Sequence, residues 1–141
     1  MKKVKLEFCE KQISVEKAWE GITSKGKDVS KSSMVKYWDK IKPGEAMSSV
    51  HESGSLFSQI KIDPKQPSPT MTSKEYRIWH WETPNLLSIK QCFRLQTFPD
   101  DYDCEDKIKH YICGMSVPPF MMQRIARQIA IQIFDIGSDE E

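Results

Sequence analysis

Three lysines lie in a short polar segment where they could meet phosphate groups. Lys25, Lys27 and Lys31 belong to the run TSKGKDVSKSS at residues 23–33, and a second small polar run, SSVHESGS, occupies residues 48–55. Lysine ammonium groups neutralise phosphates, and small residues let a backbone approach DNA closely enough to read it. Segments of this composition more often just connect two elements, so both interpretations stay open.

The cysteines show no spacing typical of a metal site. The chain contains Cys9, Cys92, Cys104 and Cys113, without a C-x-x-C pair and without a histidine at ligand spacing. We therefore expect no bound metal. Cys92 falls on an apolar helix face, which favours a buried, reduced thiol and a cytoplasmic protein. No apolar run approaches the ~20 residues of a membrane span, and the start MKKVKLEF lacks the apolar stretch of a signal peptide, so no membrane partner is expected.

Two tryptophans flank a histidine at residues 79–81. Trp79 and Trp81 around His80 could form a platform on which nucleic-acid bases stack. In a short strand next to prolines, such residues are more often packing residues. The packing interpretation is the preferred one.

The elements that must position these residues are short. Helices are predicted at about residues 15–21, 34–41 and 88–95, and strands at 56–62, 70–72 and 75–81. Ser88 and Gln91 form a capping box for the third helix, and Pro99 forbids its continuation. An acidic loop at 100–106 and a turn at 114–119 lead to a final helix over 119–136, whose isoleucines repeat every three or four residues. The pattern predicts an α+β fold.

Charge is distributed unevenly along the chain. Residues 1–98 carry an excess of lysine and arginine, and residues 99–141 an excess of aspartate and glutamate. A basic front suits a protein that faces phosphate, although charge alone is more often a solvated surface.

Three blocks resemble the C-terminal end of DNA (cytosine-5) methyltransferases. They are PSPTMTS at 67–73, RLQTFPDDY at 94–102 and GMSVPP at 114–119, in the family's order. The resemblance implies a target-recognition domain over residues 1–134 with an acidic tail at 135–141, and a last helix that packs on a Rossmann-like catalytic half. It also implies double-stranded DNA as partner, S-adenosyl-L-methionine as cofactor and a role in restriction–modification.

The same resemblance assigns roles to two residues. Thr70 would contact the DNA backbone beside a flipped cytosine, although alone it would be taken for an ordinary strand threonine. Ser116 would touch the amino-acid end of the methyl donor. The sequence departs from the family pattern at Asn85, Gln91 and Met115, where the family has Arg, Glu and Asn.

The chemistry of cytosine methylation is missing from this sequence. The family uses a Pro-Cys nucleophile, a Glu-Asn-Val segment and a glycine-rich donor loop, and none occurs here. We therefore expect no catalytic residue and no activity in the chain alone. It would be either a separate subunit, which the start MKKVK favours slightly, or a domain of a longer chain. The alternative is a non-enzymatic DNA-binding or regulatory protein that retains the recognition fold; a generic small α+β domain would not explain the ordered blocks.

Overall fold

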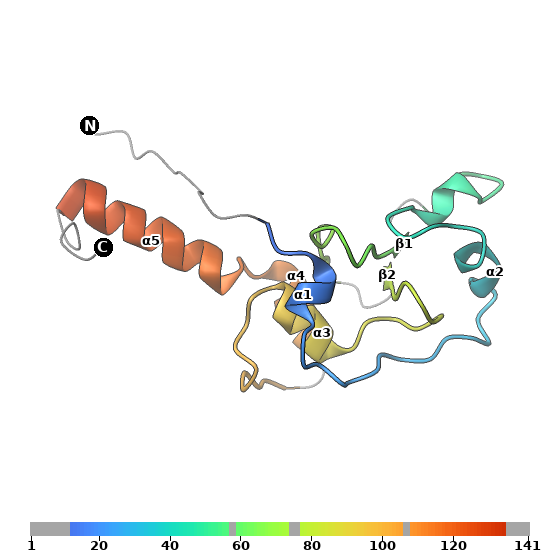
Figure 1. The fold of residues 1–141 in the computed structure, drawn as a ribbon, viewed down its shortest axis with the longest axis horizontal. Helices are drawn as coiled ribbons and strands as arrows, with labels where there is room; N and C mark the ends of the chain where they lie inside the picture. The colour runs from blue at the N-terminus through green and yellow to red at the C-terminus, as the bar shows by residue number, and fades with distance from the viewer. Residues whose placement is uncertain (1–11, 57–58, 74–76, 106–107, 135–141) are drawn as a thin grey trace.

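The computed structural model describes residues 12–56, 59–73, 77–105 and 108–134. Short elements separated by long loops make up a small body, from which one longer helix extends (Figure 1). In chain order the elements are α1 (Val15–Ala18), α2 (Val35–Trp38), the 3₁₀-helix η1 (Met47–Ser49), β1 (Ile60–Lys61), β2 (Ile78–Trp79), α3 (Ile89–Leu95), α4 (Lys109–Met115) and α5 (Pro119–Phe134). The predicted α+β class is confirmed.

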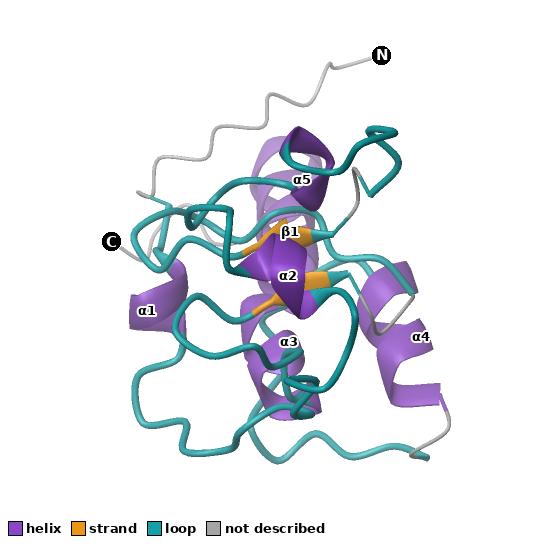
Figure 2. Ribbon diagram, turned by 90° about the vertical axis from the view of Figure 1, so that its right-hand side faces the viewer, coloured by secondary structure: helices purple, strands orange, loops and turns teal. Residues whose placement is uncertain are grey.

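The two strands form a minimal parallel sheet in the middle of the body (Figure 2). Ile60 pairs with Ile78 and Lys61 with Trp79. Both strands lie within the ranges predicted for them, 56–62 and 75–81, but they are shorter than predicted among the described residues; residues 57–58 and 75–76 of those ranges lie outside the described part of the chain. The strand predicted at 70–72 is wrong, since these residues have no ladder partner and instead run against helix α4.

Helix α3 begins and ends as its sequence predicts. The Ser88 hydroxyl accepts a hydrogen bond from the Gln91 amide at 3.2 Å, and the Gln91 side chain accepts one from the Ser88 amide at 2.8 Å. Cys92 and Phe93 are buried, so the apolar face packs inward as expected. The capping box therefore fixes the start of this helix locally.

The interior contains two apolar clusters, and strand β2 contributes one residue to each: Ile78 to the first and Trp79 to the second. The first joins α1, α3 and α4 with the start of β2; its buried members are Val15, Trp19, Ile62, Ile78, Leu87, Cys92, Phe93 and Cys113. The second lies under α2 and η1; its buried members are Trp38, Ile41, Met47, Trp79 and Leu86. Consecutive residues of β2 thus serve different clusters, as the alternation of a strand requires.

Helix α4 was not predicted. Gly114 and Met115, expected in a turn, form its last residues, and the turn starts only at Ser116. Glycine in a helix costs about 1 kcal/mol relative to alanine, so a glycine in the last turn of α4 needs another physical reason. The close contact between Gly114 and the backbone of residues 72–73 supplies the reason for a glycine at this position.

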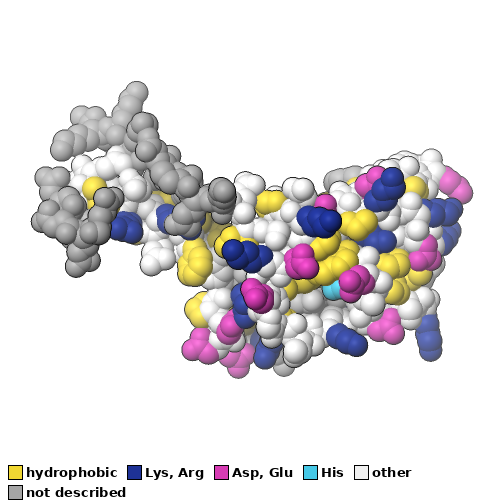
Figure 3. All heavy atoms as spheres, viewed as in Figure 1, with side chains coloured by type: hydrophobic (Ala, Val, Ile, Leu, Met, Phe, Trp, Pro, Cys, Tyr) yellow, Lys and Arg dark blue, Asp and Glu magenta, His cyan; other side chains and the backbone are white. Residues whose placement is uncertain are grey.

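Helix α5 starts at Pro119, as predicted, and its expected end at Ile136 lies outside the described residues. The Thr97 hydroxyl accepts a hydrogen bond from the Phe120 amide at 3.1 Å, which links the helix start to the segment after α3. No side chain within Pro119–Phe134 is buried, and the helix projects from the body (Figures 1 and 3). Within the described parts of the chain, no helix has the length and apolar character to cross a bilayer.

Candidate functional site

The lysine segment at residues 23–33 is held against the body. The Lys27 carbonyl accepts a hydrogen bond from the Leu86 amide at 3.0 Å, and the Val29 amide donates to the Pro84 carbonyl at 3.1 Å. A Cβ atom on Gly26 would stand 1.5 Å from the Leu86 carbonyl oxygen. Gly26 therefore allows close packing on the chain itself, whereas we expected the small residues here to approach DNA.

The side chains of this segment still face solvent. Lys25, Lys27 and Lys31 are exposed, as phosphate contact requires. Asp28 lies among them, and the backbone amide of Ser30 lowers the pKa of its carboxyl group. One fixed negative charge therefore sits beside the three positive ones.

The second polar segment, residues 48–55, is tied to α2. The rings of Tyr37 and His51 are in contact, with centroids 4.9 Å apart. The Ser53 and Ser55 hydroxyls lie 3.0 Å and 3.2 Å from Nδ1 of His51. Both polar segments lead to or from the end of the body that carries α2 (Figure 1).

Thr70 is exposed. The segment before it, residues 63–69, runs over α1, where the Val15 amide donates to the Gln66 carbonyl at 2.9 Å. In Figure 1 this green segment lies on the upper side of the body, and the blue segment 23–33 runs along its lower edge. The segment at residues 63–69 and the lysine segment therefore run along different edges of the body.

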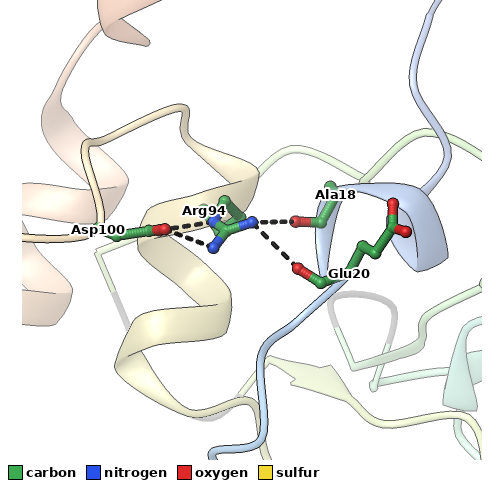
Figure 4. Close-up of polar contacts among 4 residues, drawn as sticks. All are labelled: Ala18, Glu20, Arg94 and Asp100. Carbon is green, nitrogen blue, oxygen red and sulfur yellow. Dashed lines mark hydrogen bonds and ion pairs between the residues drawn. The ribbon is translucent and has the colours of Figure 1, made fainter.

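Arg94 connects three segments, a role that our sequence interpretation missed (Figure 4). Its Nε and one terminal nitrogen donate to the two carboxylate oxygens of Asp100, both at 2.6 Å. Its other terminal nitrogen donates to the carbonyl oxygens of Ala18 and Glu20, both at 3.4 Å. The helix ends at Leu95, and Thr97, with a positive φ of 60°, turns the chain so that Asp100 comes back to Arg94.

A cleft of about 470 Å³ opens beside this pair. Its walls are residues 21–24, one face of α3 and the loop 99–103. The charges along it are matched, since Lys109 lies 3.0 Å from Asp103 and lowers the pKa of that carboxyl group. The Ser24 hydroxyl in this wall is hydrogen-bonded to the Ser88 hydroxyl at 2.9 Å.

Ser116 ends helix α4 and leads into α5. Its amide donates to the Ile112 carbonyl at 3.0 Å, and its hydroxyl oxygen is buried with no hydrogen-bond partner among the described residues. An unpartnered buried polar atom costs roughly 1–3 kcal/mol and points to a missing polar neighbour. Ser116 therefore fits contact with a polar ligand group, such as the amino-acid end of S-adenosyl-L-methionine, while Met115 beside it is exposed.

The tryptophans serve packing, as preferred. Trp79 is 3% exposed, and its indole nitrogen donates to the Gln59 side chain at 2.8 Å. Trp81 stacks on His80 at 4.1 Å and on Trp19 at 5.2 Å between ring centroids. Burial within this stack lowers the pKa of His80.

Cys92 and Cys113 are buried and Cys104 is half-buried. A hydrogen bond with Cys92 lowers the pKa of the Cys113 thiol, and its burial acts in the opposite direction. Across the described ranges, no group of three or more His, Cys, Asp or Glu side chains is arranged to hold a metal ion.

Comparison with known sequences decides the family. The sequence profile described as C-5 cytosine-specific DNA methylase matches residues 2–130. The chain belongs to the C-5 cytosine-specific DNA methylase family. Members of this family use S-adenosyl-L-methionine as methyl donor.

The chain is similar to several type II methyltransferases of this family. It is 29% identical over 114 residues to M.AquIB of Picosynechococcus, which covers 65% of this chain and 82% of that relative. It is 30% identical over 138 residues to the putative type II methyltransferase M.MJ0563P of Methanocaldococcus jannaschii, over 93% of this chain but only 44% of that relative. It is 41% identical over 71 residues to M.BbvI of Brevibacillus brevis, over 45% of this chain and 19% of that protein. No solved structure matches.

Proposed function

We propose that this chain is the DNA-recognition half of a cytosine-5 DNA methyltransferase and acts only together with a catalytic half. The observation that carries the proposal is helix α5, a described run of sixteen residues without one buried side chain. Its apolar side chains Phe120, Met121, Met122 and Ile133 are each about half exposed. A helix of this kind gains most of its stability from packing its apolar face against another surface. An exposed apolar face of this kind is typical of a site that binds a partner.

The catalytic half supplies what this sequence lacks. The chain spans 44% of the archaeal relative, so that relative contains more than half of its length outside the shared region. The short relative M.AquIB, covered to 82%, shows that similar sequence also occurs in a chain of modest length. The Pro-Cys nucleophile and donor loop would then come from a separate polypeptide or from another part of a longer one.

In this assembly the chain's own residues hold the two ligands. Lys25, Lys27 and Lys31 neutralise phosphates of double-stranded DNA, and Thr70 contacts the backbone beside the flipped cytosine. The Ser116 hydroxyl holds the amino-acid end of S-adenosyl-L-methionine, which supplies the transferred methyl group when bound. The burial of Cys92 and Cys113 favours reduced thiols and a location in the cytoplasm.

The proposal is tested by mixing this chain with a purified polypeptide from the same genome that carries the Pro-Cys motif and the glycine-rich loop. Isothermal titration calorimetry should show one-to-one association. The variant Phe120→Ser with Met121→Ser should weaken that association by at least about tenfold, because both side chains are exposed on α5. If the chain binds DNA but no such polypeptide, it is a non-enzymatic DNA-binding protein instead.

A further inference from the structure

A direct backbone contact joins the two segments that carry Thr70 and Ser116. Gly114 lies in the last turn of α4, and a Cβ atom on it would stand 2.1 Å from the Ser73 amide nitrogen and 2.1 Å from the Thr72 carbonyl carbon. Cβ atoms essentially never approach other atoms within 3.0 Å. The backbone of α4 therefore touches the backbone of residues 72–73, and only glycine permits this approach.

Both sides of the contact are anchored in the core. Cys113, next to Gly114, is 2% exposed within the first apolar cluster, and Met71, next to Thr72, packs against the same cluster. The cavity between them measures about 20 Å³, which holds no more than about one water molecule. A side chain at position 114 therefore cannot be absorbed there, and it must displace the end of α4 or the segment 70–73.

The contact lies midway between the two predicted ligand positions. Thr70 is two residues before Thr72, and Ser116 is two residues after Gly114. We propose that Gly114 is a positioning residue that fixes the DNA-contacting segment at Thr70 relative to the donor-contacting turn at Ser116. DNA and methyl donor are then coupled through this contact. The inference rests on the proposed function, because only there do Thr70 and Ser116 meet ligands.

The first test uses the chain alone. In ¹⁵N-resolved NMR spectra, Gly114→Ala should shift the amide resonances of Thr70, Thr72 and Ser116 together. Ile41→Ala is the control, since it removes a side chain that is 3% exposed in the second cluster and should leave these three amides in place. If Gly114→Ala does not fold, Thr72→Gly keeps the contacting backbone atoms but makes the backbone at position 72 more flexible, and it should move the Ser116 amide. An unmoved Ser116 amide in the folded variant overturns the inference.

The second test uses the chain with its catalytic half. Calorimetry measures the Kd of S-adenosyl-L-methionine, and labelled methyl transfer measures the KM for a cytosine-containing duplex. A misplacement of about 1 Å can cost roughly 100-fold, so Gly114→Ala should raise both constants by about tenfold or more, and Ile41→Ala should raise neither. Wild-type values in the Gly114→Ala assembly overturn the inference. If even the wild-type assembly neither binds donor nor methylates, the proposed function fails, and the NMR test alone decides the contact.

Discussion

At Arg94, one guanidinium group connects α3, the end of α1 and the loop after Pro99. The Arg94 side chain is 30% exposed and the Asp100 side chain 70% exposed. Their ion pair therefore adds at most about 1 kcal/mol to the free energy of unfolding. The two long hydrogen bonds to the Ala18 and Glu20 carbonyls add to it.

Arg94→Ala should therefore lower the free energy of unfolding by about 1–2 kcal/mol in urea denaturation. Arg94→Lys should recover only part of this, because an ammonium group cannot bind both carboxylate oxygens in a fork. Arg127→Ala, an exposed change on α5, is the control and should stay within about 0.5 kcal/mol. If Arg94→Ala and Arg127→Ala unfold at the same urea concentration, Arg94 does not link the three segments.

The three exposed lysines predict how DNA binding responds to salt. Replacing Lys25, Lys27 and Lys31 by alanine should reduce the slope of log affinity against log salt by about 2.7, at ~0.9 for each phosphate neutralised. Fluorescence anisotropy with a labelled duplex measures this slope. Lys90→Ala, on exposed α3 surface, should leave it unchanged. An unchanged slope in the triple variant would mean that these lysines do not meet phosphate.

His80 predicts a pH dependence of stability. Its burial among aromatic rings lowers its pKa in the folded chain, so the unfolded chain binds the proton more readily. Stability should therefore fall as the pH drops through the ordinary histidine value of 6.5 toward the lowered one. His80→Gln should flatten this part of the profile in chemical denaturation at pH 5 to 8. If His80→Gln shows the same dependence of stability on pH as the wild type, other titratable groups cause that dependence.

At the scale of the element, α5 leaves apolar side chains exposed along the described part of its length. Its inner-face isoleucines Ile125 and Ile129 are only half-buried, and Ile133 is 48% exposed. Changing Ile129 and Ile133 to serine should therefore cost the isolated chain less than about 2 kcal/mol, because little burial is lost, and should abolish association with the catalytic half.

Thermal denaturation of the isolated double variant decides this. Two buried isoleucines would cost roughly 4–10 kcal/mol, which would appear as a collapse of Tm. Ile62→Ser, at a site that is 0% exposed, is the matched control and should show the large loss of a true core position. A collapse in the α5 variant would mean that the helix belongs to this domain's own core.

The elements also show which parts of the fold a sequence can predict. Helix α3 and the start of α5 were predictable because Ser88, Gln91 and Pro119 act within one helical turn. Each strand has only two residues, fewer than predicted, because strand length depends on pairing with a segment far away in the sequence, as between Ile60 and Ile78. Helix α4 was missed because its Gly114 is explained only by contact with residues 72–73. The DNA contacts predicted for the lysines and Thr70 stay predictions, since exposure of these side chains is compatible with them and does not test them.

At the scale of the whole molecule, the chain is a small body with an uncovered helix and a family sequence that lacks the family's nucleophile. Cys9, Cys92, Cys104 and Cys113 follow Phe8, Gln91, Asp103 and Ile112, never a proline. Recognition of DNA and chemistry on the base would then lie in two separable parts, and neither part should be active alone.

The most direct test is transfer of tritiated methyl groups from S-adenosyl-L-methionine to genomic DNA. The account predicts no incorporation by this chain alone, none by the catalytic half alone, and clear incorporation when the two are mixed. Incorporation by this chain alone that disappears when one of its own cysteines is changed to serine would contradict it, because the nucleophile would then lie here.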